Sequence, residues 1–61
     1  MMRNIGTYAY SMDIIKERLI TGIFALGEAQ HAINDLEIHY ENGYISYSEK
    51  INYQNQLSRF L

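Results

Sequence analysis

Glu28 and His31 are the two residues whose types and spacing most suggest chemistry. In di-iron four-helix bundles, a Glu-x-x-His pair projects inward from adjacent helical turns and binds metal. A dimer would carry two such pairs, with Glu17 and Glu49 as the nearest further carboxylates. A two-residue match is common by chance, however, and His31 also suits a packed position among apolar residues. A metal-binding bundle that uses Glu28 and His31 is therefore an alternative, and the favoured interpretation assigns no metal ligand and no cofactor.

A second group of titratable residues, His31, Asp35 and His39, is spaced at intervals of four. On one helix these side chains would follow one side and offer three ligands of the kinds that zinc accepts. The simpler interpretation, which we favour, is a solvent-exposed helix edge with His–Asp pairs. No nucleophile elbow and no glycine-rich phosphate loop surrounds the serines, histidines and aspartates of the chain. The sequence therefore predicts a non-enzymatic protein with no catalytic residue.

Tyrosine is unusually frequent, with 6 tyrosines among 61 residues. Tyrosine buries a large ring while its hydroxyl stays in water, which suits a protein interface. Three of the tyrosines flank Gly43, and apolar residues precede them. We therefore predict a partner-binding surface formed by Ile20, Phe24, Ile38, Tyr40, Tyr44, Tyr47 and Tyr53.

Gly43 and the residues after it predict the turn that positions these tyrosines. A glycine tolerates the left-handed conformation in which helices commonly end. The sequence Ser46-Tyr47-Ser48-Glu49 then matches a capping box, in which serine and glutamate cap the start of a helix reciprocally. We expect a turn over residues 43–46 and a short amphipathic helix over residues 47–61, antiparallel to the preceding helix.

A regular apolar pattern precedes Gly43 and resembles the heptads of a coiled coil. Its members, spaced by four and three, are Tyr8, Met12, Ile15, Leu19, Gly22, Leu26, Ala29, Ile33, Leu36 and Tyr40. The pattern predicts an N-terminal arm over residues 1–10 and a helix over residues 11–42, about 45 Å long. Two glycines inside that helix would each cost about 1 kcal/mol relative to alanine. A break near Gly27, which gives three helices, is the alternative; the continuous register favours one long helix.

A second stripe on the same predicted helix implies a further neighbour. It consists of Ile20, Phe24, Gly27, His31, Asn34 and Ile38. A helix with two apolar faces needs two neighbours, and the short C-terminal helix covers part of one. The predicted fold is therefore all-α: one domain, a long helix plus a short antiparallel helix, assembled as a homodimer or higher oligomer, or docked on a larger protein.

Length and charge restrict the function further. A 61-residue chain without cysteine has neither disulfides nor thiolate metal sites. We therefore expect a partner subunit to stabilise it, and a chain of this size leaves little room for an enzyme pocket. The formal charge of −2 disfavours general binding to nucleic acid phosphates. The sequence also lacks a signal peptide and an apolar run long enough to cross a bilayer, and we expect a cytoplasmic protein.

These observations predict a small regulator, adaptor or inhibitor that acts through protein–protein contact. Its size and its frequent Ile, Asn and Tyr suit a phage or mobile-element accessory protein. A dimeric DNA-binding transcriptional regulator is a second alternative, since a break at Gly27 would resemble a helix-turn-helix. In that case the base-reading residue types Asn52, Asn55, Gln56 and Arg59 would lie on the last helix.

The segment from Leu36 to Leu57 resembles the short C-terminal helical-hairpin (SHOCT-type) domain. The features that carry this resemblance are Gly43, Ile45, Ser46 and Glu49. The sequence departs from the family pattern at Lys50 and Ile51, where that family has an aromatic residue. Any capped helical hairpin carries the same signature, so the resemblance implies a hairpin and assigns no family.

Overall fold

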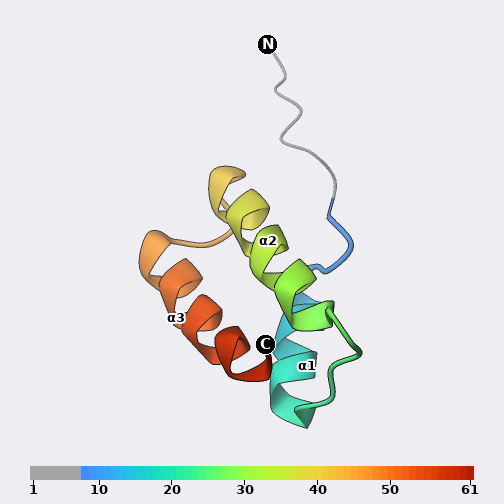
Figure 1. Ribbon diagram of the computed structural model, residues 1–61. Helices are drawn as coiled ribbons and strands as arrows, with labels where there is room; N and C mark the ends of the chain where they lie inside the picture. Colours follow the sequence, from blue (N-terminus) through green and yellow to red (C-terminus); the bar gives the residue numbers. More distant parts are fainter. Residues whose placement is uncertain (1–7) are drawn as a thin grey trace.

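The computed structural model describes residues 8–61, and these residues form three α-helices and one short 3₁₀ helix (Figure 1). The α-helices are α1 (Met12–Thr21), α2 (Glu28–Glu41) and α3 (Tyr47–Leu57), and η1 (Ser58–Phe60) follows α3 directly. No strand occurs in this part of the chain, which confirms the all-α prediction. None of the helices within residues 8–61 is long and apolar enough to cross a membrane.

The predicted continuous helix over residues 11–42 is wrong, because the chain leaves the helical conformation between α1 and α2. Ser11 does cap the start of α1, where its hydroxyl accepts a hydrogen bond from the Ile14 amide at 3.3 Å. Gly22 then ends α1 with a φ of +71°, and Gly27 precedes α2 with a φ of +79°. Both values lie in the left-handed region, which glycine adopts without steric cost. The chain thus has the three helices of the alternative prediction.

The turn between α2 and α3 forms as predicted at Gly43, which has a φ of +81°. The amide of Gly43 donates to the Tyr40 carbonyl at 3.0 Å, and the amide of Tyr44 donates to the His39 carbonyl at 2.9 Å. This pair of hydrogen bonds is the Schellman motif, which satisfies the last carbonyls of a helix. Ser46 and Glu49 then form the predicted capping box at the start of α3. The last turn of the predicted 47–61 helix tightens into the 3₁₀ helix η1.

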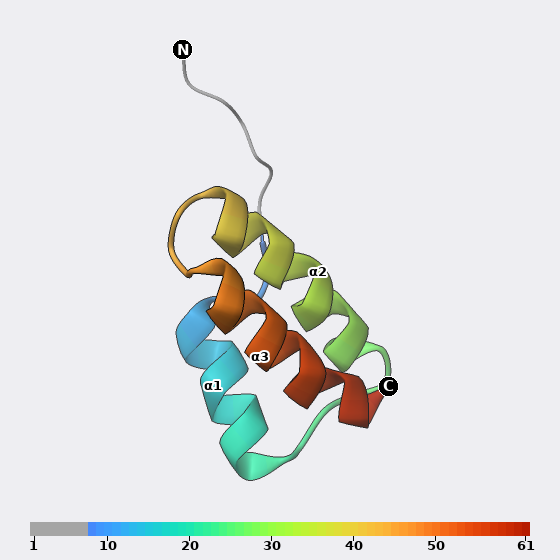
Figure 2. The same ribbon diagram turned by 90° about the vertical axis from the view of Figure 1, so that its left-hand side faces the viewer.

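A thin core joins the three helices. Its fully buried members are Ile15 of α1, Ala32 and Leu36 of α2, and Leu57 of α3, and partly buried side chains pack around them. α2 and α3 run side by side and antiparallel in both views, and α1 lies against this hairpin (Figures 1 and 2). The α2–α3 turn lies at one end of the hairpin, and the 22–27 loop and the C-terminal residues lie toward the other.

Candidate functional site

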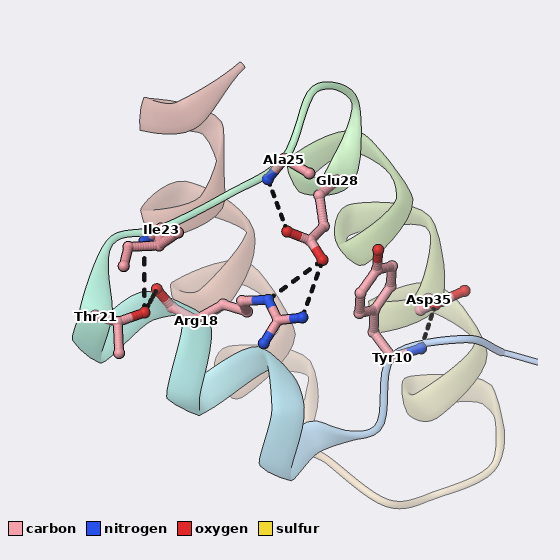
Figure 3. A network of polar contacts seen from close by, with 7 residues as sticks. All are labelled: Tyr10, Arg18, Thr21, Ile23, Ala25, Glu28 and Asp35. Carbon is pink, nitrogen blue, oxygen red and sulfur yellow. Dashed lines mark hydrogen bonds and ion pairs between the residues drawn. The ribbon is translucent and has the colours of Figure 1, made fainter.

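The carboxylate of Glu28 links the start of α2 to α1 and to the loop between them (Figure 3). Oε1 accepts a hydrogen bond from the Ala25 amide at 2.8 Å, and Oε2 accepts one from Arg18 Nε at 3.2 Å. A second guanidinium nitrogen of Arg18 lies 3.2 Å from the same Oε2. The Ala25 amide, and after it Arg18, holds the pKa of Glu28 below its ordinary value. Both oxygens of Glu28 are therefore engaged within the chain.

Tyr10 and Thr21 complete this polar network. The Tyr10 hydroxyl lies toward Glu28 (Figure 3), and burial, followed by the nearby Glu28 carboxylate, raises the pKa of Tyr10. The Thr21 hydroxyl donates to the Arg18 carbonyl at 3.2 Å and accepts from the Ile23 amide at 3.4 Å. The network thus fixes how the 22–27 loop leaves α1 and enters α2. The hydrogen bonds and the ion pair of this network join parts of the same chain.

Asp35 and His39 are buried on α2, where they bind the backbone of residues 8–10. Asp35 Oδ2 accepts hydrogen bonds from the amides of Ala9 at 3.1 Å and Tyr10 at 2.9 Å. His39 Nε2 lies 2.7 Å from the Tyr10 carbonyl oxygen, and it is the donor because a carbonyl oxygen only accepts. The expected solvent-exposed His–Asp edge is therefore wrong for these two residues. They hold the segment before α1 on the surface of α2.

The imidazole of His39 also lies between two tyrosine rings. The Tyr8 ring packs edge-on at 4.4 Å between centroids, and the Tyr44 ring lies at 5.9 Å. His39 Nδ1 is buried and has no hydrogen-bond partner among residues 8–61. His39 therefore connects the 8–10 segment to the α2–α3 turn through its ring as well as through Nε2.

Four tyrosines gather around the α2–α3 turn, and we call this surface the tyrosine end: Tyr8, Tyr40, Tyr44 and Tyr47. All four are exposed, most of all Tyr44 at 63% and Tyr47 at 59%. The Tyr40 and Tyr47 rings meet edge-on at 5.8 Å. The Lys50 ammonium lies 4.9 Å and 5.2 Å from these two ring centroids. It also pairs with Glu37 at 2.9 Å, and that bond holds the pKa of Lys50 above its ordinary value.

The other end of the molecule exposes side chains without polar tips, and we call it the aliphatic end: Ile20, Ile23, Leu26, Phe60 and Leu61. Leu26 is fully exposed, and Ile20 is 85% exposed. Phe60 packs against Phe24, with ring centroids 4.4 Å apart.

Two open grooves lie beside the 22–27 loop at the aliphatic end. One has a volume of about 590 Å³ and lies between the loop, the first turn of α2 and the C-terminal residues Phe60 and Leu61. Leu26 stands on its border. The other groove, of about 480 Å³, carries Glu17, Arg18 and Glu28 among its lining residues.

The predicted partner-binding residues divide between these two ends and the body of the molecule. Tyr40, Tyr44 and Tyr47 come together at the tyrosine end. Ile20 and Phe24 lie at the opposite end. Ile38 is half-buried, and Tyr53 is partly buried against the core. The seven residues predicted to form one surface therefore do not lie together: three are at the tyrosine end, two are at the opposite end, and two belong to the body of the molecule.

The Glu28–His31 pair is not arranged as a metal site. Glu28 turns toward Ala25 and Arg18, whereas His31 is exposed. Within residues 8–61, no group of three or more His, Cys, Asp or Glu side chains is placed to hold a metal ion.

Sequence reasoning missed the binding of residues 8–10 by Asp35 and His39, and it missed most of the aliphatic end. The heptad pattern predicts a helix that includes Ile23 and Leu26, with Leu26 packed in its seam. Two glycines that bracket a short run of apolar residues, Gly22 and Gly27, were the available signal for an exposed loop. For Asp35 and His39 no local signal exists, because their backbone partners are 25–29 residues away.

Comparisons of the chain with protein-family models, with curated proteins and with solved structures give no match. A function for this chain therefore has to be inferred from its own contacts and surfaces.

Proposed function

We propose that the chain is a small non-enzymatic regulator, adaptor or inhibitor that binds a larger protein through its tyrosine end. The observation that carries this proposal is the exposure of four tyrosine side chains around one turn of a 61-residue chain. Tyrosine contributes a large contact area at a low cost in conformational entropy, and its hydroxyl forms hydrogen bonds at a wet interface.

The tyrosine end is also held in place before a partner arrives. The Schellman motif and the capping box fix the turn, and the buried His39 ring packs against the rings of Tyr8 and Tyr44. The Lys50 ammonium lies 4.9 Å and 5.2 Å from the ring centroids of Tyr40 and Tyr47, which favours this arrangement of the two rings. A surface that is already ordered loses less entropy on binding, so it gains affinity.

The proposal is tested by affinity purification from the native host with the full chain as bait, followed by mass spectrometry. We expect a protein that is recovered with the parent chain and is lost with the Tyr44→Ser, Tyr47→Ser double variant. His31→Ala is the matched control, since His31 is exposed and lies outside the tyrosine end. Circular dichroism checks that both variants remain folded. Equal recovery of the same protein with the folded double variant would contradict the proposal.

A dimeric DNA-binding regulator is the second candidate, because the chain does break into three helices as that alternative requires. α3 exposes Asn52 and Asn55, and Arg59 of η1 is exposed beside them. Against it, two cations of the described residues are already paired: Arg18 with Glu28, and Lys50 with Glu37. Few cations then remain for phosphates. Binding to duplex DNA that weakens steeply with salt would favour this candidate over the protein-binding one.

A further inference from the structure

Most large apolar side chains at the aliphatic end are in contact with water instead of protein. Ile20, Ile23 and Leu61 are 70–85% exposed, and Leu26 is fully exposed. In the core, by comparison, the large fully buried apolar side chains are Ile15, Leu36 and Leu57. Monomeric soluble proteins rarely leave large apolar patches uncovered. The aliphatic end therefore requires an occupant.

We propose that this occupant is a second copy of the same chain, so that the protein is a two-fold dimer joined through its aliphatic ends. This surface lies at the opposite end of the molecule from the tyrosine end, and the proposal goes beyond the function proposed above. Three observations on the aliphatic end carry it: its composition, its shape and its charges.

The amino-acid composition of the aliphatic end is that of a permanent interface and not of a transient one. The aliphatic end consists of isoleucine, leucine and phenylalanine, none of which has a polar group that could hydrogen-bond to water when the surface is free. Interfaces between identical subunits are more apolar than interfaces that form and dissociate. A chain of 61 residues with a thin core also gains stability when it associates with another subunit.

Shape makes the surface complementary to itself. Leu26 projects fully into solvent from the border of the 590 Å³ groove that Phe24, Ala29 and Phe60 help to line. A two-fold axis beside Leu26 would place the Leu26 of each copy in the groove of the other. Interfaces of this kind use the same patch on both subunits, and a projection next to a groove is what they need.

Charge is compatible with the same arrangement. The neighbouring groove carries Glu17, Arg18 and Glu28; Arg18 is paired with Glu28, but its side chain stays 37% exposed beside Glu17. When two copies face each other about a two-fold axis, an acidic residue of one copy can lie opposite a basic residue of the other. The small formal charge of −2 adds little repulsion between copies.

Sedimentation velocity on the full chain tests the proposal. We expect a species of twice the 7.2 kDa mass of one chain at micromolar concentration. Leu26→Glu places a charge in the proposed interface and should raise the dissociation constant at least tenfold. Because Leu26 is fully exposed, the isolated chain should keep its helical circular dichroism spectrum. The matched control, Tyr44→Ser at the tyrosine end, should sediment like the parent chain.

A second measurement locates the interface even if a variant fails to fold. In a mixture of isotope-labelled and unlabelled parent chain, we expect intermolecular nuclear Overhauser effects between the Leu26 methyl groups and the Phe24 or Phe60 ring. A parent chain that is monomeric at millimolar concentration would overturn the proposal. So would a folded Leu26→Glu dimer, or intermolecular contacts that involve the tyrosine end instead.

Discussion

The two ends of this molecule expose similar numbers of large side chains but differ in what those side chains can do in water. At the tyrosine end, each ring has a hydroxyl, and Lys50 and His39 add polar contacts. At the aliphatic end, Ile23, Leu26 and their neighbours offer hydrocarbon alone. A surface of the first kind can stay free until a partner arrives, whereas a surface of the second kind is unfavourable while it is free. The difference supports the two proposals made above, recognition of a partner at the tyrosine end and assembly of two copies at the aliphatic end.

The largest expected effect comes from the core that both ends share. Leu36→Ala should lower the free energy of unfolding by about 3 kcal/mol, because it leaves a cavity at a fully buried position. Urea denaturation of the parent and the variant measures the difference. Leu26→Ala, the same change at a fully exposed position, should cost less than about 0.5 kcal/mol at a dilution where the chain is monomeric. Equal costs for the two variants would show that the core is not centred on Leu36.

The next effect should be confined to the tyrosine end. Asp35→Ala removes the acceptor of the Ala9 and Tyr10 amides, and we expect a loss of about 2 kcal/mol from these unsatisfied groups. Native-state hydrogen exchange should show faster exchange of both amides, while the amides of α3 keep their rates. Glu41→Ala is the control, because that carboxylate lies on the same helix and is exposed. Unchanged exchange at Ala9 and Tyr10 in the Asp35→Ala variant would contradict the proposed anchoring.

Gly27 and Gly43 allow the backbones of the two ends to be compared directly. Each has a positive φ, and a Cβ added at either position would meet no atom within 4 Å. The cost of alanine is therefore conformational at both sites, about 1 kcal/mol each. Thermal unfolding of Gly27→Ala and Gly43→Ala should give similar losses. A cost at Gly43 without one at Gly27 would mean that the loop at the aliphatic end adopts another conformation in solution.

The smallest effect expected is on acid stability, and each end has one carboxylate that contributes to it. The pKa of Glu28 is lowered chiefly by the Ala25 amide, and that of Glu49 chiefly by the Ser46 amide. A lowered pKa in the folded state stabilises the fold above the ordinary value of 4.5. This contribution is lost as the pH falls through the lower folded value.

Urea denaturation at a series of pH values measures this loss. Carboxylates titrate between about pH 6 and about pH 3. Over this range, the free energy of unfolding should decrease less in Glu28→Gln and in Glu49→Gln than in the parent chain. His31→Ala is the control and should keep the acid-dependent decrease of the parent chain. A parent-like decrease in either glutamine variant would contradict the role of that carboxylate.

The elements that sequence predicted well depend on neighbours three to five residues apart. The Schellman turn at Gly43 and the Ser46–Glu49 capping box are local patterns, and both form. The prediction of one long helix is wrong because heptad spacing shows where apolar residues recur but carries no information on the backbone angle φ. At Gly22 and Gly27 the backbone conformation decided the outcome. The burial of Asp35 and His39 could not be predicted from local patterns, because the backbone groups that they bind lie 26 and 29 residues earlier in the chain.

The hydrogen bonds that hold residues 8–10 also impose an order on folding during synthesis. His39 lies 29 residues after Tyr10 in the chain. At ~5–20 residues per second, a ribosome needs roughly one and a half to six seconds to translate that interval. Asp35, which accepts from the amides of Ala9 and Tyr10, follows them by 26 and 25 residues, so it too is absent for most of this time. α1, with 10 residues, is too short to be stable alone. α1 therefore waits for α2, and the core is complete only after Leu57 of α3 has been made.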